Sequence, residues 1–116
     1  MFKKTEKMKR VDFDALLKSG KRIQNSIVSI VFQGAETTKT AVVVSKKVSK
    51  GAVQRNLLKR RVFSILKKNR NLFEEKHIAV FVKKTATQGT YQELEKGLVD
   101  VLTQIKNGKT HVNEVE

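Results

Sequence analysis

Apolar residues recur along the chain at spacings that predict three helices. The first helix follows Asp12, a candidate N-cap, and ends at Gly20, where a left-handed C-terminal cap would fit. Helical periodicity then covers about residues 52–70, and Thr90 and Glu93 form a capping box for a last helix. The apolar positions expected to share one face of each helix are Phe13, Leu16 and Leu17 in the first, Leu58, Val62, Ile65 and Leu66 in the second, and Tyr91, Leu94, Leu98, Val101, Leu102 and Ile105 in the last.

Runs of β-branched residues predict strands at residues 27–32, 40–45 and 77–82. Residues 41–44 and 78–82 are apolar at consecutive positions, so we expect both faces of these strands to be covered. The helix between them makes a strand-helix-strand unit, which usually closes as a parallel pair. The order of elements predicts one small α+β or α/β domain over residues 1–106, and residues 107–116 are expected to form a polar, disordered tail.

The charge balance makes a polyanionic partner the leading expectation. The chain has 25 Lys or Arg residues against 11 Asp or Glu residues, a net charge of +14. Between Glu36 and Glu74 lie 37 residues with eleven Lys or Arg and no acid, a segment that we call the acid-free block. Soluble surfaces normally mix both signs, so this block indicates a surface for nucleic-acid phosphates. A merely basic, solvated surface is the alternative interpretation.

The second predicted helix and the loop before it hold the candidate RNA-binding residues. Arg55 lies near the N-terminus of this helix, where the macrodipole disfavours a cation, so we attribute it to an anion that binds there. Lys67, Lys68 and Arg70 lie at the favourable C-terminal end and receive a structural interpretation. The candidates are Lys46, Lys47, Lys50, Arg55, Asn56, Lys59, Arg60 and Arg61.

This loop and helix resemble the signature of the bacterial ribonuclease P protein family, in which a Lys-Lys loop enters a helix with an Arg-Asn motif. The matching residues are Ser45, Lys46, Lys47 and Val48, followed by Arg55, Asn56, Leu57, Leu58, Lys59 and Arg60. The resemblance extends to the Asp-Phe helix that ends at Gly20 and to the closing Thr-Tyr-x-Glu-Leu helix. Leu57 and Phe63 stand where the family usually has Arg, so we assign no RNA contact to either.

The resemblance implies a fold, two RNA partners and a second site. The fold would be an α-β-β-β-α-β-α sandwich with a four-stranded sheet and a left-handed β-α-β crossover (ribosomal protein S5 domain 2-like), against the general right-handed rule. The partners would be the catalytic ribonuclease P RNA, which performs the chemistry with bound Mg²⁺, and precursor tRNA. A cleft between the first helix and the sheet would take the single-stranded 5′ leader, although core packing is the alternative role of its residues. The cleft residues would be Phe13, Leu17, Val28, Ile30 and Val31.

Nothing in the sequence predicts a catalytic site in the protein itself. A two-metal nuclease needs clustered carboxylates, whereas the paired acids lie outside the acid-free block and one or two positions apart. These pairs are Asp12 and Asp14, Glu74 and Glu75, and Glu93 and Glu95. The two histidines, His77 and His111, are expected in a strand and in the tail, and the chain has no cysteine. We therefore predict that the protein does not cleave phosphodiesters alone and holds no metal.

Two other functions remain open at this point, a structured-RNA-binding protein such as a ribosomal protein, and a DNA-coating protein. The second is weaker because no minor-groove arm or dimerising apolar stripe is present. The sequence predicts no membrane span and no secretory signal, so we expect a cytoplasmic protein with no membrane contact and no obligate protein partner.

Overall fold

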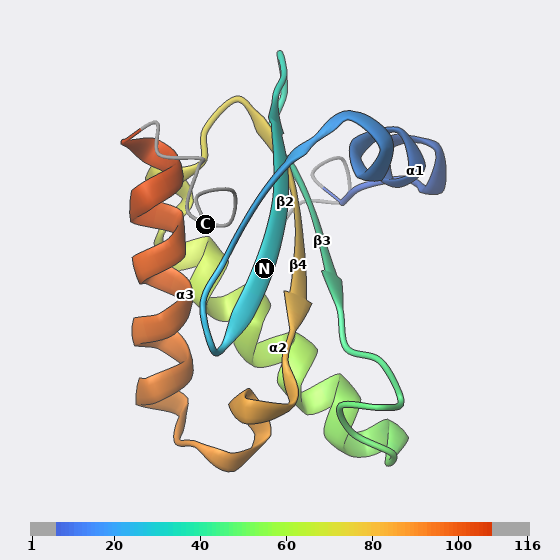
Figure 1. The fold of residues 1–116 in the computed structure, drawn as a ribbon, viewed down its shortest axis with the longest axis vertical. Helices are drawn as coiled ribbons and strands as arrows, with labels where there is room; N and C mark the ends of the chain where they lie inside the picture. Colours follow the sequence, from blue (N-terminus) through green and yellow to red (C-terminus); the bar gives the residue numbers. More distant parts are fainter. Residues whose placement is uncertain (1–6, 108–116) are drawn as a thin grey trace.

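The computed structural model describes residues 7–107, which form one four-stranded sheet with helices on both of its faces (Figure 1). The elements follow the predicted α-β-β-β-α-β-α order. They are α1 (Arg10–Ser19), β1 (Lys21–Gln24), β2 (Val28–Gly34), β3 (Lys39–Val43), α2 (Ala52–Lys68), β4 (Lys76–Val82) and α3 (Tyr91–Lys106), with short 3-10 turns η2 (Arg70–Leu72) and η3 (Lys84–Gln88). In the part of the chain that the structure describes, no helix has the length and apolar character needed to cross a membrane.

The sheet has the strand order β1-β2-β4-β3. Strand β2 pairs antiparallel with both β1 and β4, whereas β3 pairs parallel with β4, as the strand-helix-strand unit predicted. In Figure 1, β3 and β4 run downward, α2 lies behind them, and the chain passes from β3 on the right to β4 on the left. The crossover is therefore left-handed, as the resemblance implied.

The main core lies between the sheet and the two long helices, α2 and α3. The predicted apolar stripe of α2 is buried throughout, and so is that of α3 except for the half-buried Tyr91. The capping box is confirmed, because Glu93 donates its backbone N–H to the Thr90 hydroxyl and accepts from the Thr90 N–H. Because the apolar stripe of α2 is buried in the core, the opposite, polar face of α2 remains for other contacts.

In the described part of the chain, α1 packs on the opposite face of the sheet and lies across one end of the strands (Figure 1). Leu16, Val31 and Ala79 form a small second core beneath it. A short segment before α1 also runs along the outer edge of β3, where Met8 donates its N–H to the Thr40 carbonyl. This contact places Lys7 beside β3 and near α2.

Two predictions about the ends of α1 are wrong. The helix begins at Arg10, two residues before the predicted cap, and its N-cap residue Lys9 makes no side-chain hydrogen bond. Gly20 is extended, with φ of −75°, instead of left-handed. Glycine is required there because a Cβ would lie 2.6 Å from the Leu16 carbonyl oxygen and 2.8 Å from a Val31 methyl carbon.

Candidate nucleic-acid interface

The polar face of α2 borders a groove on the side away from the core. We call this the α2 groove; its volume is about 550 Å³. Its lining combines one aromatic ring with amide, hydroxyl and cationic groups, and Lys7 from the segment beside β3 closes it on one side. The lining residues are Lys7, Asn56, Lys59, Arg60, Phe63, Ser64 and Lys67.

Electrostatically, the groove is unbalanced. In the acid-free block, Lys39 pairs with Asp12 at 3.3 Å and Lys68 lies 4.0 Å from Glu95. Among residues 7–107, no carboxylate lies within ion-pair distance of the four groove cations or of the loop lysines Lys46, Lys47 and Lys50. Uncompensated cations on a grooved surface attract polyanions, so this geometry suits phosphate groups.

The candidate RNA-binding residues other than Arg55 divide into three places. Asn56, Lys59 and Arg60 lie together in the α2 groove, whereas the exposed Lys46, Lys47 and Lys50 lie in the loop before α2. Arg61 is half-buried and lines no part of the groove. Lys7, Phe63 and Lys67 also belong to the groove but were not among the candidates. Only Lys67 carried a usable sequence signal, since it follows Arg60 by two helical turns on the same face.

Arg55 has a structural role that the sequence did not predict. Its guanidinium turns back to the loop and donates to the carbonyl oxygens of Ser49 at 2.9 Å and Lys50 at 2.7 Å. These bonds hold the basic loop against the start of α2, so a cation at this unfavourable helix end has a structural role. Arg55 therefore positions the loop lysines whether or not it contacts RNA.

A second surface lies on the sheet beside α1. Its residues occupy every second position along the strands. Ser29 on β2 lies opposite Phe81 on β4, and Val31 lies opposite Ala79. The Phe13 and Phe81 rings are 6.1 Å apart, and the Arg22 guanidinium lies 5.9 Å from the Phe81 ring and donates to Ser29 at 3.1 Å. We call this side, with Arg22, Ser29, Phe81 and the half-buried Ala41 and Val43, the open sheet face.

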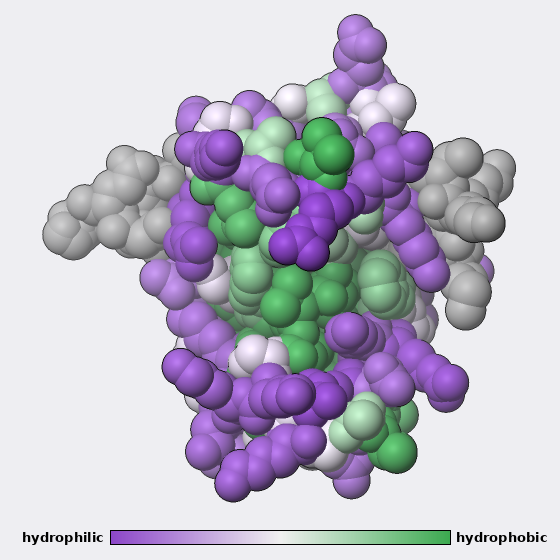
Figure 2. All heavy atoms as spheres, turned by 90° about the vertical axis from the view of Figure 1, so that its right-hand side faces the viewer, coloured by the Kyte–Doolittle hydropathy of each residue, from purple (hydrophilic) through white to green (hydrophobic). Residues whose placement is uncertain are grey.

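Figure 2 views the molecule from the side where α1, β3 and the start of α2 lie. An apolar patch occupies the middle of this view, with hydrophilic side chains above and below it. Cations beside apolar and aromatic side chains are the combination that proteins use for single-stranded nucleic acid.

The predicted cleft residues are only partly correct in their placement. Phe13 is half-buried beside Phe81, Leu17 is 42% exposed on α1, and Val31 lies beneath α1. Val28 and Ile30 are fully buried on the other face, in the main core, so their assignment to the cleft is wrong. The pleat explains this, because alternate residues of β2 point to opposite faces.

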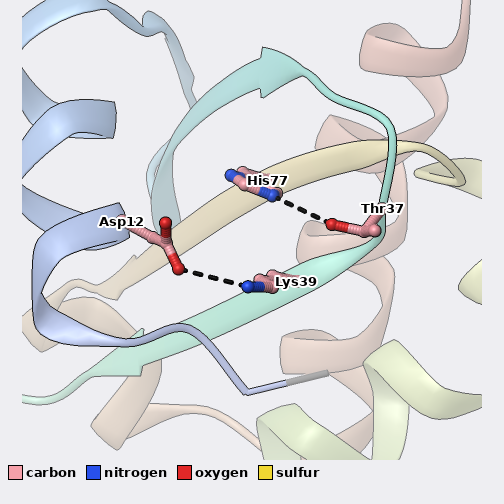
Figure 3. Close-up of polar contacts among 4 residues, drawn as sticks. All are labelled: Asp12, Thr37, Lys39 and His77. Carbon is pink, nitrogen blue, oxygen red and sulfur yellow. Dashed lines mark hydrogen bonds and ion pairs between the residues drawn. The ribbon is translucent and has the colours of Figure 1, made fainter. Parts of the chain in front are cut away.

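Asp12, one of the paired acids, has a structural role. Asp12 accepts a hydrogen bond from Lys39, and His77 lies 3.4 Å from the Thr37 hydroxyl at the same end of the sheet (Figure 3). The hydrogen bond from Lys39 holds the pKa of Asp12 below its usual value. Within the described range, no three His, Cys, Asp or Glu side chains gather in a way that could hold a metal ion; His111 lies outside that range.

Comparisons with known proteins agree with this geometry. A family model described as Ribonuclease P matches residues 2–106. The chain is 35% identical over 102 residues to the ribonuclease P protein component of Pseudanabaena sp., covering 84% of this chain and 88% of that protein. It is 31% identical over 103 residues to that of Streptococcus agalactiae, covering 86% of this chain and 94% of the relative.

Solved structures give the same result. The RNase P protein of Thermotoga maritima matches with a TM-score of 0.77 and 25% identity, over 85% of this chain and 96% of that one. A Staphylococcus aureus RNase P protein, a mutant described as defective in mRNA degradation activity, matches with a TM-score of 0.82 and 25% identity, over 89% and 90% of the two chains. Since the family model spans nearly the whole described chain and the relatives exceed 30% identity over most of theirs, the protein belongs to the ribonuclease P protein component family.

Proposed function

We propose that the protein assists an RNA enzyme in removing the 5′ leader from precursor tRNA. The observation that carries this proposal is the α2 groove, where four cations from α2 and the segment before α1 converge with no carboxylate of the described residues beside them. In this proposal, the groove and the loop lysines bind the phosphates of the catalytic RNA. Family membership supports ribonuclease P RNA as that partner.

The open sheet face is proposed to bind the leader. A single strand needs a surface on which bases can lie and cations nearby for its backbone. The Phe13 and Phe81 rings and the Arg22 guanidinium supply these elements on one side of the sheet. The leader site therefore consists of Phe13, Leu17, Arg22 and Phe81, in place of the set that included Val28 and Ile30.

The chemistry is proposed to belong to the RNA subunit. Phosphodiester cleavage with two Mg²⁺ ions needs ligands that hold both ions about 4 Å apart. Neither proposed RNA surface includes a carboxylate, so their side chains do not fit Mg²⁺ and we route no step through a metal on the protein. Phosphates of the RNA would hold Mg²⁺, while protein cations lower the repulsion between the two RNAs.

Reconstitution tests this function. Ribonuclease P RNA and precursor tRNA are mixed at low Mg²⁺, with and without the protein, and leader release is followed. We expect the protein to accelerate cleavage, and to release no leader when the RNA subunit is omitted. Binding to the RNA subunit without acceleration would favour the alternative of a structured-RNA-binding protein, and cleavage by RNA-free protein would contradict the proposal.

A further inference from the structure

We propose that the exposed side chains of Val53 and Leu57, near the start of α2, contact the faces of unpaired bases in the RNA that binds the acid-free block. We call these two residues the apolar pair. This inference rests on the proposed function, because it names which part of the RNA this surface takes. It also gives a role to Leu57, a residue to which the sequence assigned no RNA contact.

The apolar pair forms a small hydrophobic surface on α2. Val53 is 79% exposed and Leu57 is 43% exposed, and neither belongs to the main core. Residues four positions apart on a helix are neighbours, so the two side chains adjoin. Figure 2 shows apolar side chains among hydrophilic ones at the lower end of its view, where α2 begins. Single exposed apolar residues are common on soluble proteins, whereas two adjoining ones inside a cationic surface indicate a contact.

Cations border the apolar pair at both ends. Arg60 and Arg61 follow Leu57 by three and four positions, which places both beside it on the helix. At the other end, Arg55 donates to the Lys50 carbonyl oxygen at 2.7 Å and so holds the loop with this exposed lysine at the helix start. Within residues 7–107, none of Lys50, Arg60 and Arg61 has a carboxylate within ion-pair distance. A partner that covers the apolar pair must therefore also bring negative charge.

An RNA meets this requirement better than other occupants do. A second copy of the chain would bring its own net charge of +14 and be repelled. A lipid surface binds helices that offer a long apolar face, whereas the long apolar stripe of α2 is buried in the main core. An acidic protein would satisfy the cations, but membership of the ribonuclease P protein component family supports an RNA.

Unpaired bases are the part of an RNA that can cover apolar side chains. A duplex presents phosphates and ribose hydroxyls at its surface and stacks its base faces inside, whereas loops, bulges and strand ends expose these faces to a protein. Removing Val53 and Leu57 from water against a base face is favourable without any release of counterions, in contrast to the phosphate contacts of the cations. The apolar pair should therefore supply a salt-independent part of the affinity.

The affinity for ribonuclease P RNA, measured over a series of salt concentrations, provides the direct test. The double variant Val53→Ala/Leu57→Ala removes carbon atoms outside the main core and introduces good helix formers, so it should stay folded, which a thermal melt verifies. We expect its affinity to fall by about 5- to 50-fold at every salt concentration, the size expected for partial burial of the deleted carbon atoms. The slope of log affinity against log salt should not change, because no charge is removed.

The matched control for the double variant is Val11→Ala, at a 77% exposed position on α1, which should bind ribonuclease P RNA as the wild type does. An unchanged affinity in the double variant, an equal loss in the control, or a changed salt slope would overturn the proposal.

Single variants at position 57 separate apolar contact from side-chain size. Leu57→Met keeps an apolar side chain of similar volume and should bind ribonuclease P RNA as the wild type does. Leu57→Gln keeps a long side chain and a similar helix propensity but ends in a polar amide, so its affinity should fall by about 3- to 10-fold. Equal affinities of these two variants would overturn the proposal.

Model strands test whether the apolar pair contacts bases. The probes are a single-stranded uridylate decamer and an abasic strand with the same number of phosphates. Relative to the wild type, the double variant should bind the uridylate decamer more weakly and the abasic strand equally well. Equal losses for both strands, or no loss for either, would overturn the proposal.

Sedimentation of the protein alone tests the second copy as the occupant. We expect a monomer, and a wild-type dimer that the double variant dissociates would assign the apolar pair to self-association and overturn the proposal. Failure of the wild-type protein to bind ribonuclease P RNA would instead contradict the proposed function. Normal binding that the double variant leaves intact would contradict this inference alone, so the two failures are distinguishable.

Discussion

Arg60 projects from the polar face of α2, two residues away from the buried position Leu58 and without a carboxylate partner among the described residues. An exposed cation in this position contributes little to folding. We predict that Arg60→Ala lowers affinity for ribonuclease P RNA by roughly tenfold or more, the value of a charge-assisted hydrogen bond, and leaves the thermal melt unchanged. Filter binding and calorimetry measure the two effects. Lys96→Ala, on the exposed side of α3, is the matched control, and an equal loss of affinity there would contradict a specific surface.

Arg55 should behave in the opposite way. Its two hydrogen bonds to the Ser49 and Lys50 carbonyls hold the loop, so Arg55→Ala is expected to destabilise the fold by about 1–2 kcal/mol. RNA affinity should fall as well, because the loop lysines lose their position. Urea unfolding measures the stability, with Arg60→Ala as the comparison. If Arg55→Ala weakened RNA binding and left the unfolding free energy unchanged, Arg55 would be a direct contact and its structural role would be minor.

Phe13 tests the leader site. Its half-buried ring lies beside Phe81, so Phe13→Ala should reduce the affinity of the assembled enzyme for precursor tRNA by about 1–3 kcal/mol, with little effect on mature tRNA. The ratio of the two affinities is the measurement, and melting curves run beside it. A loss of about 3–5 kcal/mol in stability with an unchanged ratio would assign Phe13 to core packing alone.

At the scale of elements, α2 and α3 could be predicted because their apolar residues follow helical spacing and Thr90 and Glu93 mark a start. The start of α1 could not, since Lys9 has no capping side chain and Asp12 binds Lys39 on β3. Which residues of β2 face α1 could not be predicted either, for a different reason. Residues 28–32 are buried on both faces, and Ser29 is the one polar residue among them, so the alternation that would mark the side toward α1 is weak. Only the pairing of β2 with β4 puts Val31 there and sends Ile30 to the main core.

The link between α1 and the sheet should depend on pH. The pKa of Asp12 is depressed in the folded protein, so its interaction with Lys39 stabilises the fold above the unfolded pKa of about 3.9 and is lost as pH falls through the folded pKa. We predict that Asp12→Asn melts below the wild type at pH 6, and that the difference shrinks as pH falls below about 4. Melting curves of Lys39→Ala should show the same closing difference. A difference that stays undiminished down to pH 3 would show that another contact holds α1.

At the scale of the whole molecule, the fold separates stability from RNA binding. The main core occupies one side of the sheet, while the cations of the acid-free block and the open sheet face remain at the surface. The Lys46–Lys47 loop and the α2 groove both follow β3, on the edge opposite β1, whereas the open sheet face lies beside α1, so the two proposed RNA surfaces are at different places. In the proposed function, this arrangement would let a small chain with a net charge of +14 contact a catalytic RNA and its substrate together.

The salt dependence of binding to ribonuclease P RNA tests this account most directly. Each phosphate contact contributes about −0.7 to the slope of log affinity against log salt for single strands, so about five contacts predict a slope of roughly −3 to −4. The double variant Lys59→Ala/Arg60→Ala removes two groove cations and should reduce the steepness by about 1.4, whereas Lys96→Ala should leave the slope unchanged. A wild-type slope near zero, or an unchanged slope in the double variant, would contradict the claim that the acid-free block is the RNA surface.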